Sequence, residues 1–283
     1  MNENLLPKTP TCDEWLRQAS IRLAEAGVGS ARLDAELILA HTLRKPRTYL
    51  HAHGEVVLNN RQMTIANARL ELRCNRTPIA YIIGHKEFYG RLFKTTPAAL
   101  IPRPESESFM TLLKDILENN GILHASKLHL VDVGTGTGCL GITAKLEWPE
   151  LDVTIIDNST YALTLAKENA SLLEAEVHVT KSDLLSGYGL PVDIIVANLP
   201  YVDRSWEVSP DTQAEPVEAL FAEKGGLSLI YRLLDQTVHL LRPGGYVLLE
   251  SDPRQQDSII DYAKSRNLKH CKTEGFITVF SRP

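Results

Sequence analysis

A glycine-rich turn and an asparagine at the end of an apolar run are the residues of this chain best placed for chemistry. The turn, VDVGTGTGCLG, contains Gly136-x-Gly138-x-x-Gly141, which matches the fingerprint of dinucleotide-binding folds. This spacing alone indicates only that the backbone approaches a ligand closely where a strand turns into a helix. The apolar run, IIVANLPY, ends on Asn198 and continues through Pro200. A side-chain amide at such a point could hold or orient a polar group.

Three aspartates each stand at the end of a predicted strand. Asp132 precedes the glycines, where a carboxylate would disfavour a pyrophosphate but could anchor an ammonium group. Asp157 ends VTIID and could accept both hydroxyls of a ribose, and Asp183 ends TKSD and could accept from an adenine amino group. Each aspartate alone fits a helix cap or a turn equally well. Together with the glycines they favour S-adenosylmethionine, a cationic amino acid joined to a nucleoside, and an NAD-dependent oxidoreductase remains an alternative.

The elements that must position these residues alternate between strand and helix from about residue 128 onward. Apolar runs such as LHLVDV, VTIID and VDIIVA are separated by amphipathic segments such as YALTLAKENASLLE. This pattern predicts an α/β fold with a doubly wound, mostly parallel sheet. Ligands bind such sheets at the carboxyl ends of the strands. Asn198, at the end of the fourth strand, is therefore expected beside the glycine turn.

The front of the chain has a helical pattern instead. Thr11 and Glu14 have the spacing of a capping box, and the helix that they begin ends near Gly27. The stretches SARLDAELILAHTLR and LNNRQMTIANARLELRCNR predict two more helices. Aromatic and β-branched residues around Gly84 and Gly90 then predict a hairpin-like connector. The predicted domains are a helical bundle over 1–75, a connector over 76–104 and a ligand-binding α/β domain over 105–283.

Composition and charge narrow the class of protein. Four scattered cysteines without a C-x-x-C pair fit free thiols in a cytoplasmic protein and give no metal site. There is no apolar run long enough to predict a membrane span. Residues 1–104 carry 15 Lys and Arg against 9 Asp and Glu, whereas residues 105–283 carry 15 against 26. The cationic front could steer an acidic partner, and the acidic remainder disfavours direct binding of nucleic acid.

The stretch Asn198-Leu199-Pro200-Tyr201 resembles the Asn-Pro-Pro-Tyr motif of methyltransferases that modify a nitrogen on a planar, conjugated group. The lone pair of such a nitrogen is delocalised, which makes it a poor nucleophile. An amide oxygen and a neighbouring backbone carbonyl can accept its N–H groups and aim the lone pair at the methyl donor. The aromatic ring can stack on the planar group. The motif serves adenine-amino enzymes and glutamine-amide enzymes alike.

A wider resemblance separates these two substrates. The segment IPRPESE, the run Glu215-Pro216-x-x-Ala219-Leu220 with Gly226-Leu227, and LRPGGYVLLESDPRQ are similar to the bacterial release-factor glutamine methyltransferases. The similarity extends from about residue 11 to the C-terminus, with Ser106 where threonine is usual. It implies a class I methyltransferase sheet, a helical domain that docks the substrate, and methylation of the glutamine in the Gly-Gly-Gln loop of class 1 peptide chain release factors.

The resemblance also implies a set of site residues. The catalytic residues are Asn198, Pro200 and Tyr201, and with Leu199 they hold the glutamine amide. The residues expected to bind S-adenosylmethionine, which leaves as S-adenosylhomocysteine, are Asp132, Gly134, Thr135, Gly136, Thr137, Gly138, Asp157, Asp183, Leu184 and Asn198.

Two positions depart from the family pattern. Leu184 replaces a frequent aromatic, and Leu199 replaces the first proline of the motif. Pro200 still restrains Leu199 toward an extended backbone, but Leu199 regains an N–H group and freedom in φ. We therefore predict a lower turnover. The alternatives left open are a diverged, non-catalytic homologue and an N6-adenine methyltransferase acting on RNA or DNA.

Overall fold

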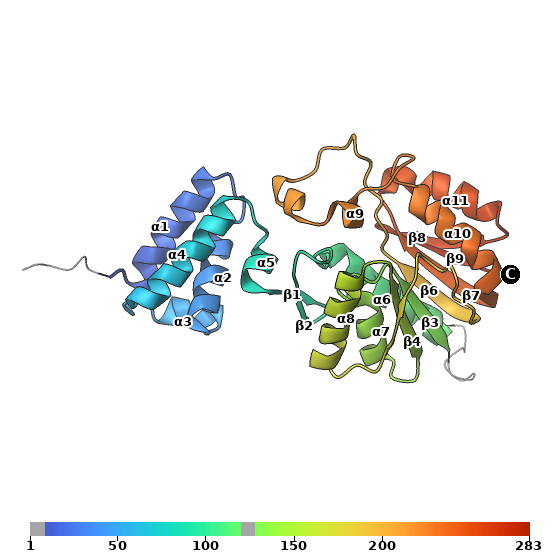
Figure 1. Cartoon of the computed structure of the whole chain (residues 1–283), viewed down its shortest axis with the longest axis horizontal. Helices are drawn as coiled ribbons and strands as arrows, with labels where there is room; N and C mark the ends of the chain where they lie inside the picture. The colour runs from blue at the N-terminus through green and yellow to red at the C-terminus, as the bar shows by residue number, and fades with distance from the viewer. Residues whose placement is uncertain (1–8, 120–127) are drawn as a thin grey trace, which may run out of the picture. The chain divides into compact units, whose positions relative to one another are not determined.

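A computed structural model describes residues 9–119 and 128–283 (Figure 1). Residues 1–8 of the predicted helical domain lie outside the described residues. Contacts within the chain divide it into two units. One takes the residues up to Gly84 together with Ser209–Ala214, and the other takes His85–Val208 and Glu215–Pro283. The connector hairpin thus belongs to the second unit, and a short later segment belongs to the first.

The first unit is a bundle of helices around one apolar core. The predicted capping box at its start is present, because Glu14 N donates to Thr11 Oγ1 at 3.2 Å and Thr11 N donates to Glu14 Oε2 at 2.9 Å. Trp15 and Leu39 lie in the buried core. The helices are α1 (Cys12–Glu25), α2 (Ala31–Leu43), α3 (Arg47–Ala52), α4 (Asn60–Cys74) and α5 (Ile79–Ile83).

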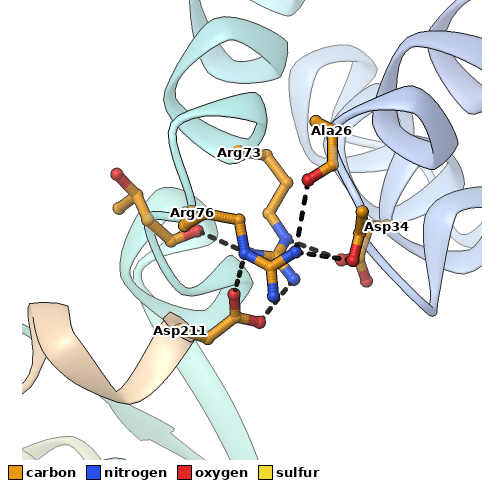
Figure 2. A network of polar contacts seen from close by, with 7 residues as sticks. Ala26, Asp34, Arg73, Arg76 and Asp211 are labelled. Atoms are coloured by element: carbon orange, nitrogen blue, oxygen red, sulfur yellow. Dashed lines mark hydrogen bonds and ion pairs between the residues drawn. The ribbon is translucent and has the colours of Figure 1, made fainter. Parts of the chain in front are cut away.

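A buried ion network lies in the same unit (Figure 2). Arg73, on α4, donates through Nε to Asp34 on α2 at 2.7 Å, and both side chains are almost fully buried. Its Nη2 donates to Asp211 at 2.7 Å. Asp211 also pairs with Arg76 at 2.7 Å. Segment 209–214, which the chain inserts between two parts of the α/β unit, is thereby held on the helical unit.

We expect Asp34→Ala to lower the free energy of unfolding of the helical unit by about 3 kcal/mol, because it leaves Arg73 buried with only one of its two carboxylate partners. Urea unfolding followed by circular dichroism would measure this. Glu71→Ala is the matched control, since its ion pair with Arg22 is exposed and should be worth less than about 1 kcal/mol. Equal effects of the two substitutions would contradict the expectation.

The second unit is built on a seven-stranded sheet in the order β5-β4-β3-β6-β7-β9-β8. All pairings from β5 to β7 are parallel, and β9 is antiparallel to both of its neighbours. The predicted α/β, mostly parallel fold is confirmed. The strands are β3 (His129–Val133), β4 (Asp152–Asp157), β5 (His178–Lys181), β6 (Val192–Ala197), β7 (Leu241–Glu250), β8 (Lys269–Glu274) and β9 (Ile277–Ser281).

Helices cover both faces of this sheet (Figure 1). Alternate residues of the central strands face opposite ways, so Leu130 packs in one core and Val131 in the other. One core includes α6 (Ser108–Asn119), α7 (Cys139–Glu147) and α8 (Thr160–Leu172), and the other includes α10 (Ser228–Leu240) and α11 (Gln256–Lys264). The short helix α9 (Val217–Leu220) follows segment 209–214.

The connector forms the predicted hairpin, β1 (His85–Phe88) paired with β2 (Arg91–Lys94). Asn169, fully buried on α8, joins this hairpin to the glycine turn. Its Oδ1 accepts from Lys94 N at 2.7 Å, while its Nδ2 donates to the carbonyls of Lys94 and Thr137 at 3.1 and 2.9 Å. One amide therefore positions both the connector and the turn.

Candidate active site

The site lies where the strand order of the sheet reverses. β3 has β4 on one side and β6 on the other, so the connections leave in opposite directions and open a crevice at the carboxyl ends of the strands. Val133 pairs in register with Ala197. The next residues along the two strands, Gly134 and Asn198, both line the cavity at this edge. The glycine turn and the asparagine are thus brought together, as the sequence predicts.

The glycine turn is held against β4 by its backbone. Gly134 N and Thr135 N both donate to the Ile156 carbonyl, at 2.8 and 2.9 Å. Gly134 has a φ of +73°, and a Cβ there would come within 2.7 Å of Leu199 Cδ2. Only glycine satisfies both the backbone and the packing at this point. The backbone of the turn is therefore exposed to whatever enters the cavity.

Asp132 is buried beneath the turn and braces it. Its Oδ2 accepts from Thr135 Oγ1 at 2.6 Å and from Gly141 N at 2.9 Å. Its Oδ1 is equally buried and accepts no hydrogen bond from the described residues. Burial raises the pKa of Asp132 to about 6, although its two hydrogen bonds oppose the rise. A positive charge nearby would favour the ionised form of this carboxyl.

Asp157 lies in the cavity itself. Its Oδ2 accepts from Gly136 N at 3.0 Å and its Oδ1 accepts from Ser159 N at 2.8 Å, which fixes the carboxylate at the end of β4. Burial raises its pKa. Described residues that line the same cavity are Ala98, Ala99, Leu100, Gly134, Gly136, Asn158, Ser159, Ala162, Asn198, Pro216, Glu218 and Ala219.

The third predicted carboxylate lies elsewhere. Asp183 is about half exposed and pairs with Arg232 at 2.6 Å. Leu184 is buried in the core beneath α10 and α11, with a φ of +52°. Neither is among the described residues that line the cavity. Thr135, Thr137 and Cys139 instead line a second cavity, which shares Gly134, Gly136 and Asn198 with the first.

Asn198 belongs to a buried polar network with residues from distant parts of the chain. Asn198 Nδ2 donates to Ser106 Oγ at 3.0 Å. Ser106 Oγ donates to Glu250 Oε2 at 2.5 Å, and the Tyr201 hydroxyl donates to Glu250 Oε1 at 3.2 Å. Ser106 comes from the IPRPESE segment and Glu250 ends β7. The asparagine and the tyrosine of the motif are thus linked through one carboxylate.

The rest of the motif is fixed by packing. The Leu199 side chain is buried in the core beneath the glycine turn, against Gly134, and does not line either cavity. The Tyr201 carbonyl accepts from Gln255 Nε2 at 2.8 Å. Gly226 passes so close to this carbonyl that a Cβ would lie 1.9 Å away. Burial raises the pKa of the Tyr201 hydroxyl, which therefore stays protonated.

The IPRPESE segment is held beside the cavity by Glu215. This nearly fully buried carboxylate accepts from Ile101 N at 3.1 Å and from Arg103 Nη2 at 2.5 Å. Pro216 follows directly and lines the cavity. The two segments that carry much of the family resemblance thus meet at one ion pair and form one wall of the site.

Three residues that hold the motif, Ser106, Glu250 and Gln255, were not among the site residues predicted from the sequence. Glu250 ends the apolar run GYVLLE in the same way that Asp157 ends VTIID, so an acid at a strand end was an available signal. Ser106 and Gln255 lie in segments that resemble the family, but their roles depend on partners far away in the sequence.

The strand order, the glycine turn after the first strand and the amide after the fourth define a class I methyltransferase fold. A family model described as "PrmC N-terminal domain" matches residues 14–84, and one described as "Methyltransferase small domain" matches residues 110–227. A release factor glutamine methyltransferase of Koribacter versatilis is 38% identical over 233 residues, 81% of each chain. Another, of Escherichia coli, is 33% identical over 252 residues, 87% of each chain.

The chain therefore belongs to the release factor glutamine methyltransferase family, as its motifs indicate. Solved structures agree on the fold. A methyltransferase from Pyrococcus furiosus superposes with a TM-score of 0.50 at 17% identity, covering 77% of this chain and 98% of its own. The hMettl16 catalytic domain gives 0.52 at 15% identity, covering 81% and 86%. No described helix is long and apolar enough to cross a membrane.

Proposed function

We propose that this chain transfers a methyl group from S-adenosylmethionine to the side-chain amide nitrogen of a glutamine in a peptide chain release factor. The observation that carries the proposal is the position of Asn198. It lines both cavities at the switch point of the sheet, next to the glycine turn, and it is held by a carboxylate network. Family membership supplies the substrate, which by resemblance is the glutamine of the Gly-Gly-Gln loop.

The residues present fit S-adenosylmethionine. Asp157 presents a half-buried carboxylate to the cavity and could accept from ribose hydroxyls. Asp132 keeps one buried oxygen without a hydrogen-bond partner among the described residues, which suits a nearby ammonium. Gly134, Gly136 and Thr137 would line the remainder. When bound, the donor supplies a sulfonium methyl group with a neutral thioether as leaving group. Asp183 and Leu184 remain predicted contacts.

The acceptor chemistry follows from the motif. The Asn198 amide oxygen and the backbone carbonyl of Leu199 would accept the two N–H groups of the substrate amide. This fixes the nitrogen and frees its lone pair for in-line attack. The Tyr201 ring would stack on the planar amide. No strong base is needed before transfer, because the methylated amide nitrogen readily loses its extra proton.

Donor binding should depend on the ionisation of Asp132. Only the charged carboxylate attracts the ammonium, and the pKa of Asp132 is near 6. The dissociation constant of S-adenosylhomocysteine should therefore rise as the pH falls below the pKa, by up to about tenfold per pH unit. Calorimetric titrations between pH 5 and 8 would measure it. Asp132→Asn should bind more weakly and lose this dependence, whereas the same slope in both proteins would assign it to other groups.

Two alternative functions are tested together with the main one. An adenine-amino methyltransferase would use the same motif, although the acidic charge of residues 105–283 disfavours it. A non-catalytic homologue would bind the donor without transferring its methyl group. The purified chain should be given radiolabelled donor with a release factor, with RNA or with DNA. Incorporation of the label into the release factor alone supports the proposal. Incorporation into RNA or DNA overturns it, and so does binding of the donor without any transfer.

A further inference from the structure

Ser106 and Glu250 both accept hydrogen bonds from the amide of Asn198, and Ser106 lines the second of the two cavities beside it. Ser106 is 2% exposed and Glu250 is also 2% exposed, so water does not compete for their hydrogen bonds. Glu250 accepts from Ser106 at 2.5 Å and from Tyr201 at 3.2 Å, and the Asn198 amide adds a further hydrogen bond that lowers its pKa. Burial raises the pKa of Glu250, and these three hydrogen bonds oppose the rise.

The number of protons in this network fixes the direction of each hydrogen bond. Ser106 uses its single proton to donate to Glu250 at 2.5 Å, and Glu250 likewise accepts from the Tyr201 hydroxyl. The oxygen of Ser106 can then only accept, and the side-chain group that it contacts on Asn198 must be the N–H group. The amide of Asn198 has one donor end and one acceptor end. Its oxygen is consequently left for the cavity.

We infer that Ser106 and Glu250 are positioning residues that hold the Asn198 amide in the one orientation that presents its oxygen to the substrate. The reverse orientation would direct an N–H group at the N–H groups of the substrate nitrogen. It would repel the substrate in the transition state while leaving the shape of the site unchanged. This inference rests on the proposed function and assigns the orientation of its central residue to two side chains outside the motif.

The inference predicts a different result for each variant. Ser106→Ala removes the acceptor, and loss of one hydrogen bond predicts a kcat lower by about tenfold. Ser106→Thr keeps the hydroxyl and should retain activity. Glu250→Gln introduces a donor that can reverse the Ser106 hydrogen bond, and kcat should fall by about 100-fold. Ser251→Ala is the matched control, because Ser251 follows Glu250 and is fully buried, but its hydroxyl contacts no described partner.

Steady-state kinetics with a purified release factor, together with donor titration and thermal melting of each variant, would test these predictions. We expect kcat to fall in Ser106→Ala and Glu250→Gln while the dissociation constant of the donor stays close to that of the unaltered chain. The double variant should be no slower than Glu250→Gln alone, because both substitutions act on the same amide.

Three outcomes would overturn the inference. They are unchanged kcat in Ser106→Ala and Glu250→Gln, equal losses in Ser106→Ala and Ser106→Thr, and losses matched by weaker donor binding or a lower melting temperature. If the unaltered chain and the variants methylate the release factor at the same rate, the inference is wrong and the proposed function still stands. An unaltered chain that transfers no methyl group would remove both.

Discussion

Replacing Asn198 with alanine should lower kcat for methylation of a release factor by about 100- to 1000-fold, the loss typical of removing one hydrogen-bonding group that acts on the reacting atoms. Asn198 lies at the end of β6, beside the glycine turn, and no other described side chain of the motif offers an amide oxygen to the cavity. Single-turnover kinetics with saturating donor would measure the change in the chemical step.

Asn198→Asp gives a sharper version of the same test. The aspartate has the same shape and retains an acceptor oxygen, but it cannot donate to Ser106 and it places a second carboxylate beside Glu250. We expect kcat to fall nearly as far as in the alanine variant. Donor binding, measured by titration, should fall much less than kcat in either variant. Full activity in Asn198→Ala would show that the amide does not take part in the reaction.

The second large effect is expected at Asp157. Its alanine variant should raise the dissociation constant of the donor by about 100- to 10,000-fold, because two charge-assisted hydrogen bonds are lost at about 1.5–3 kcal/mol each and every 1.4 kcal/mol is tenfold. The same carboxylate accepts from Gly136 N and Ser159 N, so the glycine turn should also loosen. Calorimetric titration with S-adenosylhomocysteine would measure the effect without any turnover.

A control for Asp157 exists on the same strand. Asp152 is the first residue of β4, at the end of the strand opposite to Asp157, and it lies near His178. Asp152→Asn should leave donor binding unchanged. If the two substitutions weakened donor binding equally, the effect would come from the strand as a whole. The same titration on Asp183→Asn tests the remaining predicted contact, for which the exposed ion pair with Arg232 suggests a small change.

Much of this site could be predicted from the sequence because it depends on local patterns. Apolar runs that end on Asp157 and Asn198 define strands with polar ends, and a parallel sheet brings such ends to one edge. The buried strands are continuous apolar runs because helices cover both faces of the sheet. The sequence does not predict β8, because Lys269–Glu274 is polar and exposed almost throughout and carries no apolar pattern.

The partners of these residues could not be read in the same way. The Ser106–Glu250 hydrogen bond joins residues 144 positions apart, and the Arg73–Asp211 pair joins residues 138 positions apart. Nothing local in the sequence encodes either contact. Asp183 is an acid near a strand end, as predicted, but it pairs with Arg232 and is not among the described residues that line the cavity, so its contact with the donor remains a prediction.

Leu199 is the least expected residue of the motif, and its packing accounts for a leucine at this position. Its side chain fills the core beneath Gly134, so the leucine adds buried apolar contact where a proline would add backbone rigidity. The lower turnover predicted from the sequence remains a prediction. It concerns the backbone at the acceptor carbonyl, which the side-chain packing of Leu199 does not decide.

The most direct test of the central claim is mass spectrometry of a release factor incubated with the purified chain and S-adenosylmethionine. The result expected is a mass increase of one methylene group on the peptide that contains the Gly-Gly-Gln glutamine, located by fragmentation to that side chain. It should be absent when Asn198→Ala replaces the unaltered chain. An unmodified glutamine peptide after incubation with a chain that binds the donor would contradict the proposed function.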